Sequence, residues 1–174
     1  MSAYALVEID FQGWVLAATE SDGVVERAVA VRAGARAAGA VVVCSRYLSR
    51  DPGDPERSDP VGPGESFVAE LAPEAGDLVL TKYGRDLAEN PDLDANLRLR
   101  GITDVVLTGV ATEHGVSLTA TSLAGLGYQV WVAHEGCAGV TRSEHEAALA
   151  ELSGQGVRVV ASEDLRWSAL QRLA

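Results

Sequence analysis

Residues 104–126 combine three kinds of local signal, and the first twelve read Asp104-Val105-Val106-Leu107-Thr108-Gly109-Val110-Ala111-Thr112-Glu113-His114-Gly115. The run 104–108 is apolar and β-branched, 109–115 is a turn with a glycine at each end, and 116–126 is typical of a helix that stops before Gly127. A strand that is continuously apolar is typical of a parallel sheet covered on both faces. This order of strand, turn and helix predicts one unit of an α/β fold.

The same alternation recurs on both sides of this stretch. Gly39 and Gly101 follow two predicted helices as C-terminal caps, and Ser143 with Glu146 forms a capping-box pattern. We therefore expect an α/β fold, a doubly wound, mainly parallel six-stranded sheet with helices on both faces, in one domain over residues 1–174. The other predicted strands are 5–9, 40–44, 77–80, 129–132 and 157–160, and the other predicted helices are 24–38, 92–100, 143–152 and 163–173.

Composition limits the partners and the compartment. The 174 residues carry a formal net charge of -11, which disfavours nucleic acid and membrane surfaces as partners. The two cysteines, Cys44 and Cys137, form no disulfide framework and suit a reducing compartment. Since neither a signal peptide nor an apolar run of membrane-spanning length is visible, we expect a cytoplasmic protein.

One stretch, residues 51–63, interrupts the alternation. It holds four of the chain's six prolines and follows the second strand, so it must be a loop that leaves the carboxyl edge of the sheet. Two readings stay open, a lid or wall of a pocket and a solvated surface excursion.

Polar residues at the carboxyl ends of the strands are the candidates for chemistry, because ligands bind at that edge of open α/β sheets. Asp10 follows the first strand, Ser45-Arg46 end the second, Lys82 ends the third, and residues 109–115 follow the fourth. If the strands are neighbours, Asp10, Lys82 and the 109–115 turn converge. A partly desolvated Asp10 would suit acid/base catalysis. The alternative for Asp10 is a carboxylate that caps the loop backbone, and the alternative for Lys82 is a solvated lysine at the strand end.

Three segments in this order resemble the isochorismatase-like (cysteine hydrolase) superfamily. Residues 5–12 are similar to its opening strand with the catalytic Asp and a following Gln, and residues 76–82 to its strand with the catalytic Lys. Residues 93–97, 101–112 and 119–120 are similar to its most recognisable region. The resemblance implies the three-layer fold above, a small-molecule substrate, no cofactor, no metal and a homo-oligomer. It also implies a cis peptide bond at Val110–Ala111.

The chain departs from the amide-hydrolysing members at Gly115, where those members carry a cysteine nucleophile. Isochorismatases of the superfamily resemble this chain in having glycine there. Their reaction cleaves a vinyl ether and needs no nucleophilic side chain. The catalytic positions implied here are Asp10 as general acid, Lys82 as its electrostatic partner and Gly115. The substrate-binding positions are Gln12, Arg46, Tyr47, Arg85, Val110, Ala111 and His114.

Several roles remain open at this stage. Arg85 either binds a substrate carboxylate or pairs with Asp86, and His114 is either an acid/base group, a ligand or neither. His145 is expected on the surface, and Trp14 with Val15 form pocket wall, subunit contact or core.

Three classes of function compete. The first is a hydrolase of a small, carboxylated molecule that works without a cysteine nucleophile, and the second is a repurposed, inactive member that binds a small molecule or takes part in assembly. A nucleotide-binding Rossmann domain is disfavoured, because residues 10–13 read Asp-Phe-Gln-Gly and no Gly-x-Gly-x-x-Gly follows the first strand.

Overall fold

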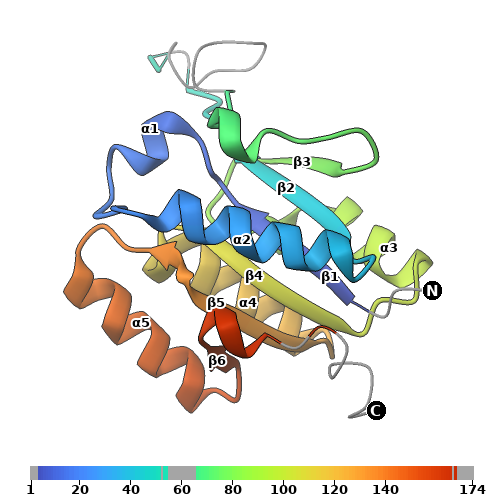
Figure 1. The fold of residues 1–174 in the computed structure, drawn as a ribbon. Coiled ribbons are helices and arrows are strands. Elements are labelled where there is room, and N and C mark those ends of the chain that lie inside the picture. Colours follow the sequence, from blue (N-terminus) through green and yellow to red (C-terminus); the bar gives the residue numbers. More distant parts are fainter. Residues whose placement is uncertain (1–3, 52, 55–65, 166, 168–174) are drawn as a thin grey trace.

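The computed structural model describes residues 4–51, 53–54, 66–165 and 167. They form a six-stranded sheet in the order β3-β2-β1-β4-β5-β6, in which every neighbouring pair is parallel (Figure 1). The expected doubly wound α/β fold and all six predicted strands are therefore confirmed. The strands are β1 (Tyr4–Ile9), β2 (Val41–Tyr47), β3 (Leu78–Lys82), β4 (Asp104–Val110), β5 (Gln129–Ala138) and β6 (Arg158–Val160).

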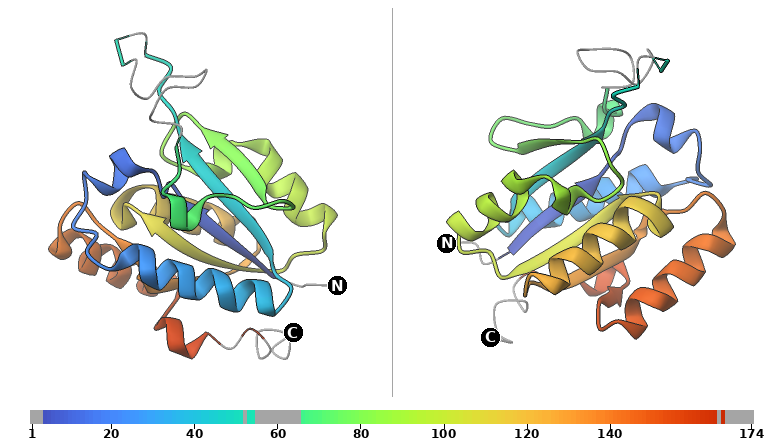
Figure 2. Two further views of the ribbon diagram at one scale, coloured as in Figure 1. Left: turned by 45° about the horizontal axis from the view of Figure 1, so that its top comes forward. Right: turned by 180° about the vertical axis from the view of Figure 1, so that it is seen from behind.

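Helices cover both faces of the sheet (Figures 1 and 2). One core cluster packs Val31 and Ala35 of α2 against Leu6 and Val106 of the sheet. The larger cluster, on the other face, joins the strands to leucines of α3, α4 and α5. These helices are α2 (Val24–Ala37), α3 (Pro91–Leu99), α4 (Ser117–Gly125) and α5 (Arg142–Gly154), and a short α1 (Gly13–Leu16), which the sequence did not predict, follows β1.

The predicted cap of α5 is wrong by two residues. The Thr141 side chain accepts a hydrogen bond from the backbone N–H of Glu144 and donates one to its carboxylate, so these two residues form the capping box. The expected partner Glu146 instead pairs with Arg142 one turn away. The sequence contains two overlapping capping patterns, and the pattern that begins earlier is the one used.

Two predictions fall wholly or partly on residues outside the described ones. Of the loop 51–63, residues 52 and 55–63 are outside them. Of the predicted helix 163–173, the structure describes a 3₁₀ turn at Ser162–Asp164, while residues 166 and 168–173 lie outside the described residues.

A buried ion pair ties α2 to the centre of the sheet. Arg32 of α2 donates from Nε to the Glu8 carboxylate of β1 at 3.0 Å, and also donates to the carbonyls of Leu71 and Ala72. Burial of two charges is tolerated because each is paired and hydrogen-bonded. The pair thus anchors the segment that leads into β3, the strand that carries Lys82.

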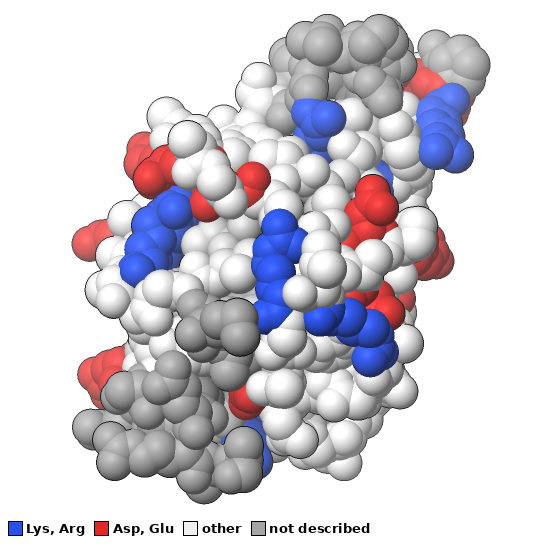
Figure 3. Space-filling view, turned by 90° about the vertical axis from the view of Figure 1, so that its right-hand side faces the viewer, with Lys and Arg blue, Asp and Glu red and all other residues white. Residues whose placement is uncertain are grey.

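The surface shows no continuous basic face in the view of Figure 3. Lys and Arg side chains there are interspersed with Asp and Glu among the described residues. Within the described parts of the chain, no helix has both the length and the apolar character needed to cross a membrane.

Candidate active site

Asp10 and Lys82 form a buried ion pair at the carboxyl edge of the sheet. Asp10 directly follows β1 and Lys82 ends β3, and the two side chains meet over the end of the intervening β2 with Nζ 2.7 Å from Oδ2. Asp10 is 3% exposed and Lys82 4% exposed, so the solvated reading of Lys82 is wrong. Convergence was expected if the strands are neighbours, and the two side chains do meet, although β2 separates their strands.

Asp10 is held in an unusual backbone conformation. Its φ of +54° lies in the left-handed region, which non-glycine residues rarely adopt and which concentrates at functional sites. Its carboxylate accepts hydrogen bonds from Lys82 and from the Ser45 hydroxyl, rather than capping the loop backbone. Burial raises the pKa of Asp10 above its ordinary value, while Lys82 and Ser45 act in the opposite direction.

The Lys82 ammonium has all three of its hydrogens directed at groups of this chain. Besides Asp10, it reaches the carbonyl oxygens of Arg85 at 3.0 Å and Gly84 at 3.3 Å, and it lies 4.9 Å from the centre of the Tyr47 ring. An ammonium has only three donors. Lys82 therefore holds the Asp10 carboxylate next to the loop that follows β3.

A cavity of about 270 Å³ opens beside this pair. On its rim, Nη1 of Arg85 lies 3.4 Å from Nδ1 of His114, so the two side chains that the sequence proposed as ligand contacts come together. The alternative in which Arg85 pairs with Asp86 is not observed, because the Asp86 carboxylate accepts from the Ala88 N–H and from the Ser122 hydroxyl. The wall consists of Asp10, Trp14, Val15, Ala18, Thr19, Tyr47, Lys82, Arg85, Val110, Ala111, His114, Gly115 and Val140.

The 109–115 turn brings its backbone against the Asp10–Lys82 pair. The peptide bond Val110–Ala111 is cis, as expected, and a π-helical turn at Thr112–Val116 leads into α4. A Cβ placed on Gly115 would lie 2.8 Å from Cγ2 of Ile9 and 3.4 Å from Nζ of Lys82. Glycine thus allows this turn to approach the pair closely.

Neither cysteine of the chain supplies a thiol to this cavity. Cys44 is buried beside the Glu8–Arg32 pair, and Cys137 is buried with its sulfur 3.5 Å from the carbonyl of Ala133. Burial raises the pKa of both thiols, that of Cys137 to about 12. Both cysteines therefore stay protonated, and a protonated thiol is a poor nucleophile.

Two predicted substrate contacts lie elsewhere. The Gln12 amide donates to the carbonyl of Tyr47 at 3.1 Å and accepts from its N–H at 2.7 Å, while Arg46 donates to the Thr81 hydroxyl at 2.8 Å. Of the described residues, neither Gln12 nor Arg46 belongs to the cavity wall. Their observed contacts tie β2 to the segment after β1 and to β3.

The contacts of two side chains near the site were not predicted from the sequence. Ser45 was placed at a strand end without a role, and it contacts Asp10. His145 was expected on the surface, but it is half-buried with Nδ1 2.7 Å from the Thr112 hydroxyl, so it supports the π-helical turn from α5. Burial lowers the pKa of His145, with help from nearby His134. No local pattern signals either contact.

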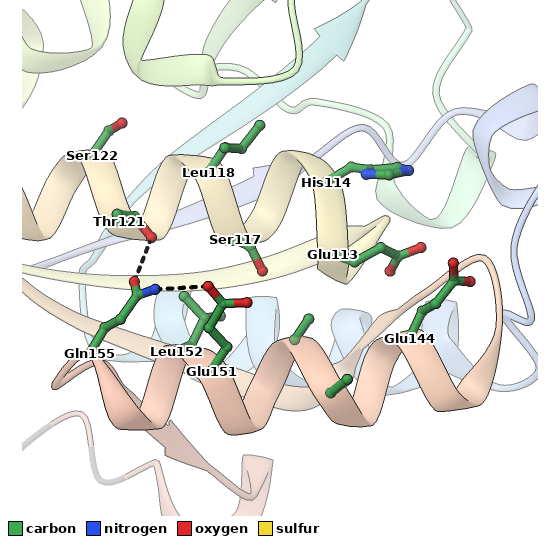
Figure 4. A pocket seen from close by; sticks show the side chains of 12 residues that line it. Glu113, His114, Ser117, Leu118, Thr121, Ser122, Glu144, Glu151, Leu152 and Gln155 are labelled. Carbon is green, nitrogen blue, oxygen red and sulfur yellow. Dashed lines mark hydrogen bonds between the residues drawn. The ribbon is translucent and has the colours of Figure 1, made fainter.

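A second hollow, a groove of about 550 Å³, lies between α4 and α5 (Figure 4). His114 lines both this groove and the cavity. Gln155, which directly follows α5, accepts from Thr121 of α4 across the groove and donates to Glu151 of α5. Asp10 and Lys82 lie outside its wall, so it is not the candidate active site. In the described part of the chain, no three His, Cys, Asp or Glu side chains group as metal ligands would.

Known proteins resemble this chain over most of its length. A family model described as "Isochorismatase domain" matches residues 4–164. YwoC, an uncharacterised isochorismatase family protein of Bacillus subtilis, is 33% identical over 156 residues, which cover 83% of this chain and 82% of YwoC. The maleamate amidohydrolase of Pseudomonas putida is 31% identical, covering 97% of this chain and 86% of that enzyme.

Solved structures of the same family also resemble this chain. An isochorismatase family protein from Burkholderia thailandensis superposes with a TM-score of 0.86 at 26% identity, over 98% of this chain and 97% of that one. Sequence relatives, family model and fold agree over nearly the same residues. This chain therefore belongs to the isochorismatase family of hydrolases.

Proposed function

We propose that this protein hydrolyses a small, carboxylated molecule without a cysteine nucleophile. Asp10 is the general acid, Lys82 is its electrostatic partner, and the bond is a vinyl ether or a related acid-labile bond. The observation that carries the proposal is the buried Asp10–Lys82 pair on the wall of a cavity where the adjoining turn residue, Gly115, has no side chain. A carboxyl group can donate a proton there, but the chain's two thiols are elsewhere.

The proposed reaction uses one proton and one water. Protonated Asp10 transfers its proton to the methylene carbon of the vinyl ether, and the neighbouring carbon becomes an oxocarbenium ion. Water adds to that carbon and its released proton returns to Asp10. As the C–O bond of the hemiketal then breaks, its hydroxyl proton moves to the departing oxygen, which yields an alcohol and a carbonyl compound.

The environment of Asp10 suits both states of this cycle. Burial raises the pKa of Asp10 and so favours the acid form before transfer. Lys82, 2.7 Å away, stabilises the carboxylate that remains afterwards. The proton donor and the partner for its conjugate base are thus already in place before substrate binds.

The carboxylated substrate is argued from the cavity rim. Arg85 is exposed and lines the cavity beside His114, and a guanidinium can hold a carboxylate with two hydrogen bonds. Maleamate, after which the Pseudomonas putida relative is named, is itself a carboxylate. Val110, Ala111 and Tyr47 complete the wall around such a substrate.

The second candidate function is binding without catalysis. The observation that favours it is the complete use of the three Lys82 donors by Asp10, Gly84 and Arg85, which leaves substrate none of them. In that case the protein keeps the fold and the cavity as a small-molecule-binding or assembly module.

The test is a panel of carboxylated vinyl ethers, including isochorismate, and carboxylated amides. Pyruvate or ammonia release is followed for wild type, Asp10→Asn and the control Asp94→Asn, a surface carboxylate paired with Arg98. We expect vinyl-ether turnover that Asp10→Asn lowers by about 10² or more and the control leaves unchanged. Amide turnover alone contradicts the proposal, and saturable binding of the panel compounds without turnover supports the second candidate.

A further inference from the structure

Ser45 contacts Asp10 through both its main chain and its side chain. The Asp10 N–H lies 3.3 Å from the Ser45 carbonyl and 3.2 Å from the Ser45 hydroxyl oxygen, and that hydroxyl donates to Asp10 Oδ1 at 2.6 Å. Ser45 lies in β2 and is fully buried. Among the described residues it is not part of the cavity wall, so it can act on a substrate only through Asp10.

These contacts fix the direction of the Ser45 hydroxyl hydrogen. A hydroxyl has one hydrogen, and here its oxygen faces the Asp10 N–H, so the hydrogen is directed to the carboxylate. Oδ1 of Asp10 is thereby an acceptor. The other oxygen, Oδ2, accepts from the Lys82 ammonium.

We propose that Ser45 is a positioning residue that holds the Asp10 carboxyl group in one orientation, with Oδ1 on the Ser45 hydroxyl and Oδ2 on Lys82. This inference rests on the proposed function, because Asp10 becomes a carboxylate in each cycle of the proposed reaction. A free carboxyl group turns about its bond to Cβ, and a donor on each oxygen restrains that rotation. Ser45 therefore both orients the Asp10 carboxyl group and stabilises its charged form by a hydrogen bond.

The surroundings allow Ser45 to be changed without loss of the strand. The Gln12 side chain pairs with both backbone groups of Tyr47, two residues along β2, and Asp10 N–H keeps the Ser45 carbonyl as a partner. β1 and β2 also pair from Ala5–Val41 to Glu8–Cys44. Removal of one buried hydroxyl should thus leave the fold intact, and circular dichroism checks this.

The experiment follows the Asp10 carboxyl carbon by ¹³C NMR as a function of pH in wild type, Ser45→Ala and Ser45→Thr. The signal is assigned by its loss in Asp10→Asn. The matched control is Ser122→Ala, which removes a serine that donates to a different carboxylate, Asp86, at 2.5 Å. Ser45→Ala removes a donor that stabilises the carboxylate, so we expect its Asp10 titration midpoint to move to higher pH. Ser45→Thr should restore the wild-type midpoint, and the control should not change it.

With any substrate found in the panel, Ser45→Ala should lower kcat on the order of tenfold with KM unchanged, because a charged hydrogen bond is lost and no substrate contact is removed. The decline of kcat/KM at high pH should move in the same direction as the NMR midpoint. An Asp10 midpoint that does not move in Ser45→Ala overturns the role of Ser45, whether or not a substrate exists. A shifted midpoint in a protein that turns over nothing contradicts the proposed function instead.

Discussion

Lys82→Met tests how strongly the buried pair depends on its cation. The Nζ–Oδ2 distance is 2.7 Å and both residues are at most 4% exposed. Coulomb's law gives an attraction of about 6 kcal/mol at an effective dielectric constant of ~20. Removal of one partner from a buried pair typically costs about 3–5 kcal/mol, so a loss of that size is expected at neutral pH if Asp10 stays charged.

The stability lost in Lys82→Met should be larger at neutral pH than at acidic pH. Burial already raises the pKa of Asp10 above its ordinary value of 3.8, and without Lys82 it rises further. The folded variant then binds a proton that the unfolded chain releases, so its free energy of unfolding falls as pH rises above about 4. At lower pH, Asp10 is neutral in both states and the cost of Lys82→Met should shrink.

The assay is urea unfolding of wild type, Lys82→Met and Asp10→Asn/Lys82→Met at about pH 4.5 and about pH 7.5. The double variant should regain most of the stability lost at the higher pH, because it buries no unpaired charge. Arg98→Met, which removes the exposed partner of Asp94, is the matched control and should change little. Equal losses at both pH values, or no recovery in the double variant, would show that Lys82 does not compensate a buried charge on Asp10.

Two further predictions concern the turn and its support. Gly109→Ala should lower the free energy of unfolding in urea by more than about 2 kcal/mol, because φ is +139° and a Cβ would lie against the Ile9 carbonyl. The control Gly125→Ala, where a Cβ meets nothing within 4 Å, should be neutral or stabilising. A larger loss of stability in Gly125→Ala than in Gly109→Ala would contradict the turn geometry. The lowered pKa of His145 means that the unfolded chain binds the proton first, so wild-type stability should fall as pH drops below about 6.5. His145→Gln should flatten that part of the curve, and an unchanged curve would exclude His145 as its source.

The convergence of the site could be predicted from the sequence for a simple reason. Carboxyl ends of parallel strands share one edge, so recognising the strands put Asp10, Lys82 and the 109–115 turn on the same edge, and the order of the strands brings them together there. The strands themselves were visible because each is a short β-branched run. The glycines after α2 and α3 adopt the left-handed conformation that their positions implied, with φ of 74° at Gly39 and 64° at Gly101.

Side-chain partners across long sequence separations could not be predicted in this way. Gln12 lies beside the site in the sequence, yet its amide is used by the Tyr47 backbone, 35 residues away. His145 meets Thr112 across 33 residues, from a helix whose polar face looks solvated in the sequence. Both contacts depend on how closely elements pack, which residue patterns do not encode.

The proposed function requires that Asp10, and no cysteine, carries the reaction. The most direct measurement compares kcat/KM for the best vinyl ether of the panel among wild type, Cys44→Ala/Cys137→Ala and Asp10→Asn. We expect the variant without cysteines to keep wild-type kcat/KM within about twofold, while Asp10→Asn loses about 10² or more. A variant without cysteines that is folded but inactive, or an Asp10→Asn variant with unchanged kcat/KM, would contradict the proposed function.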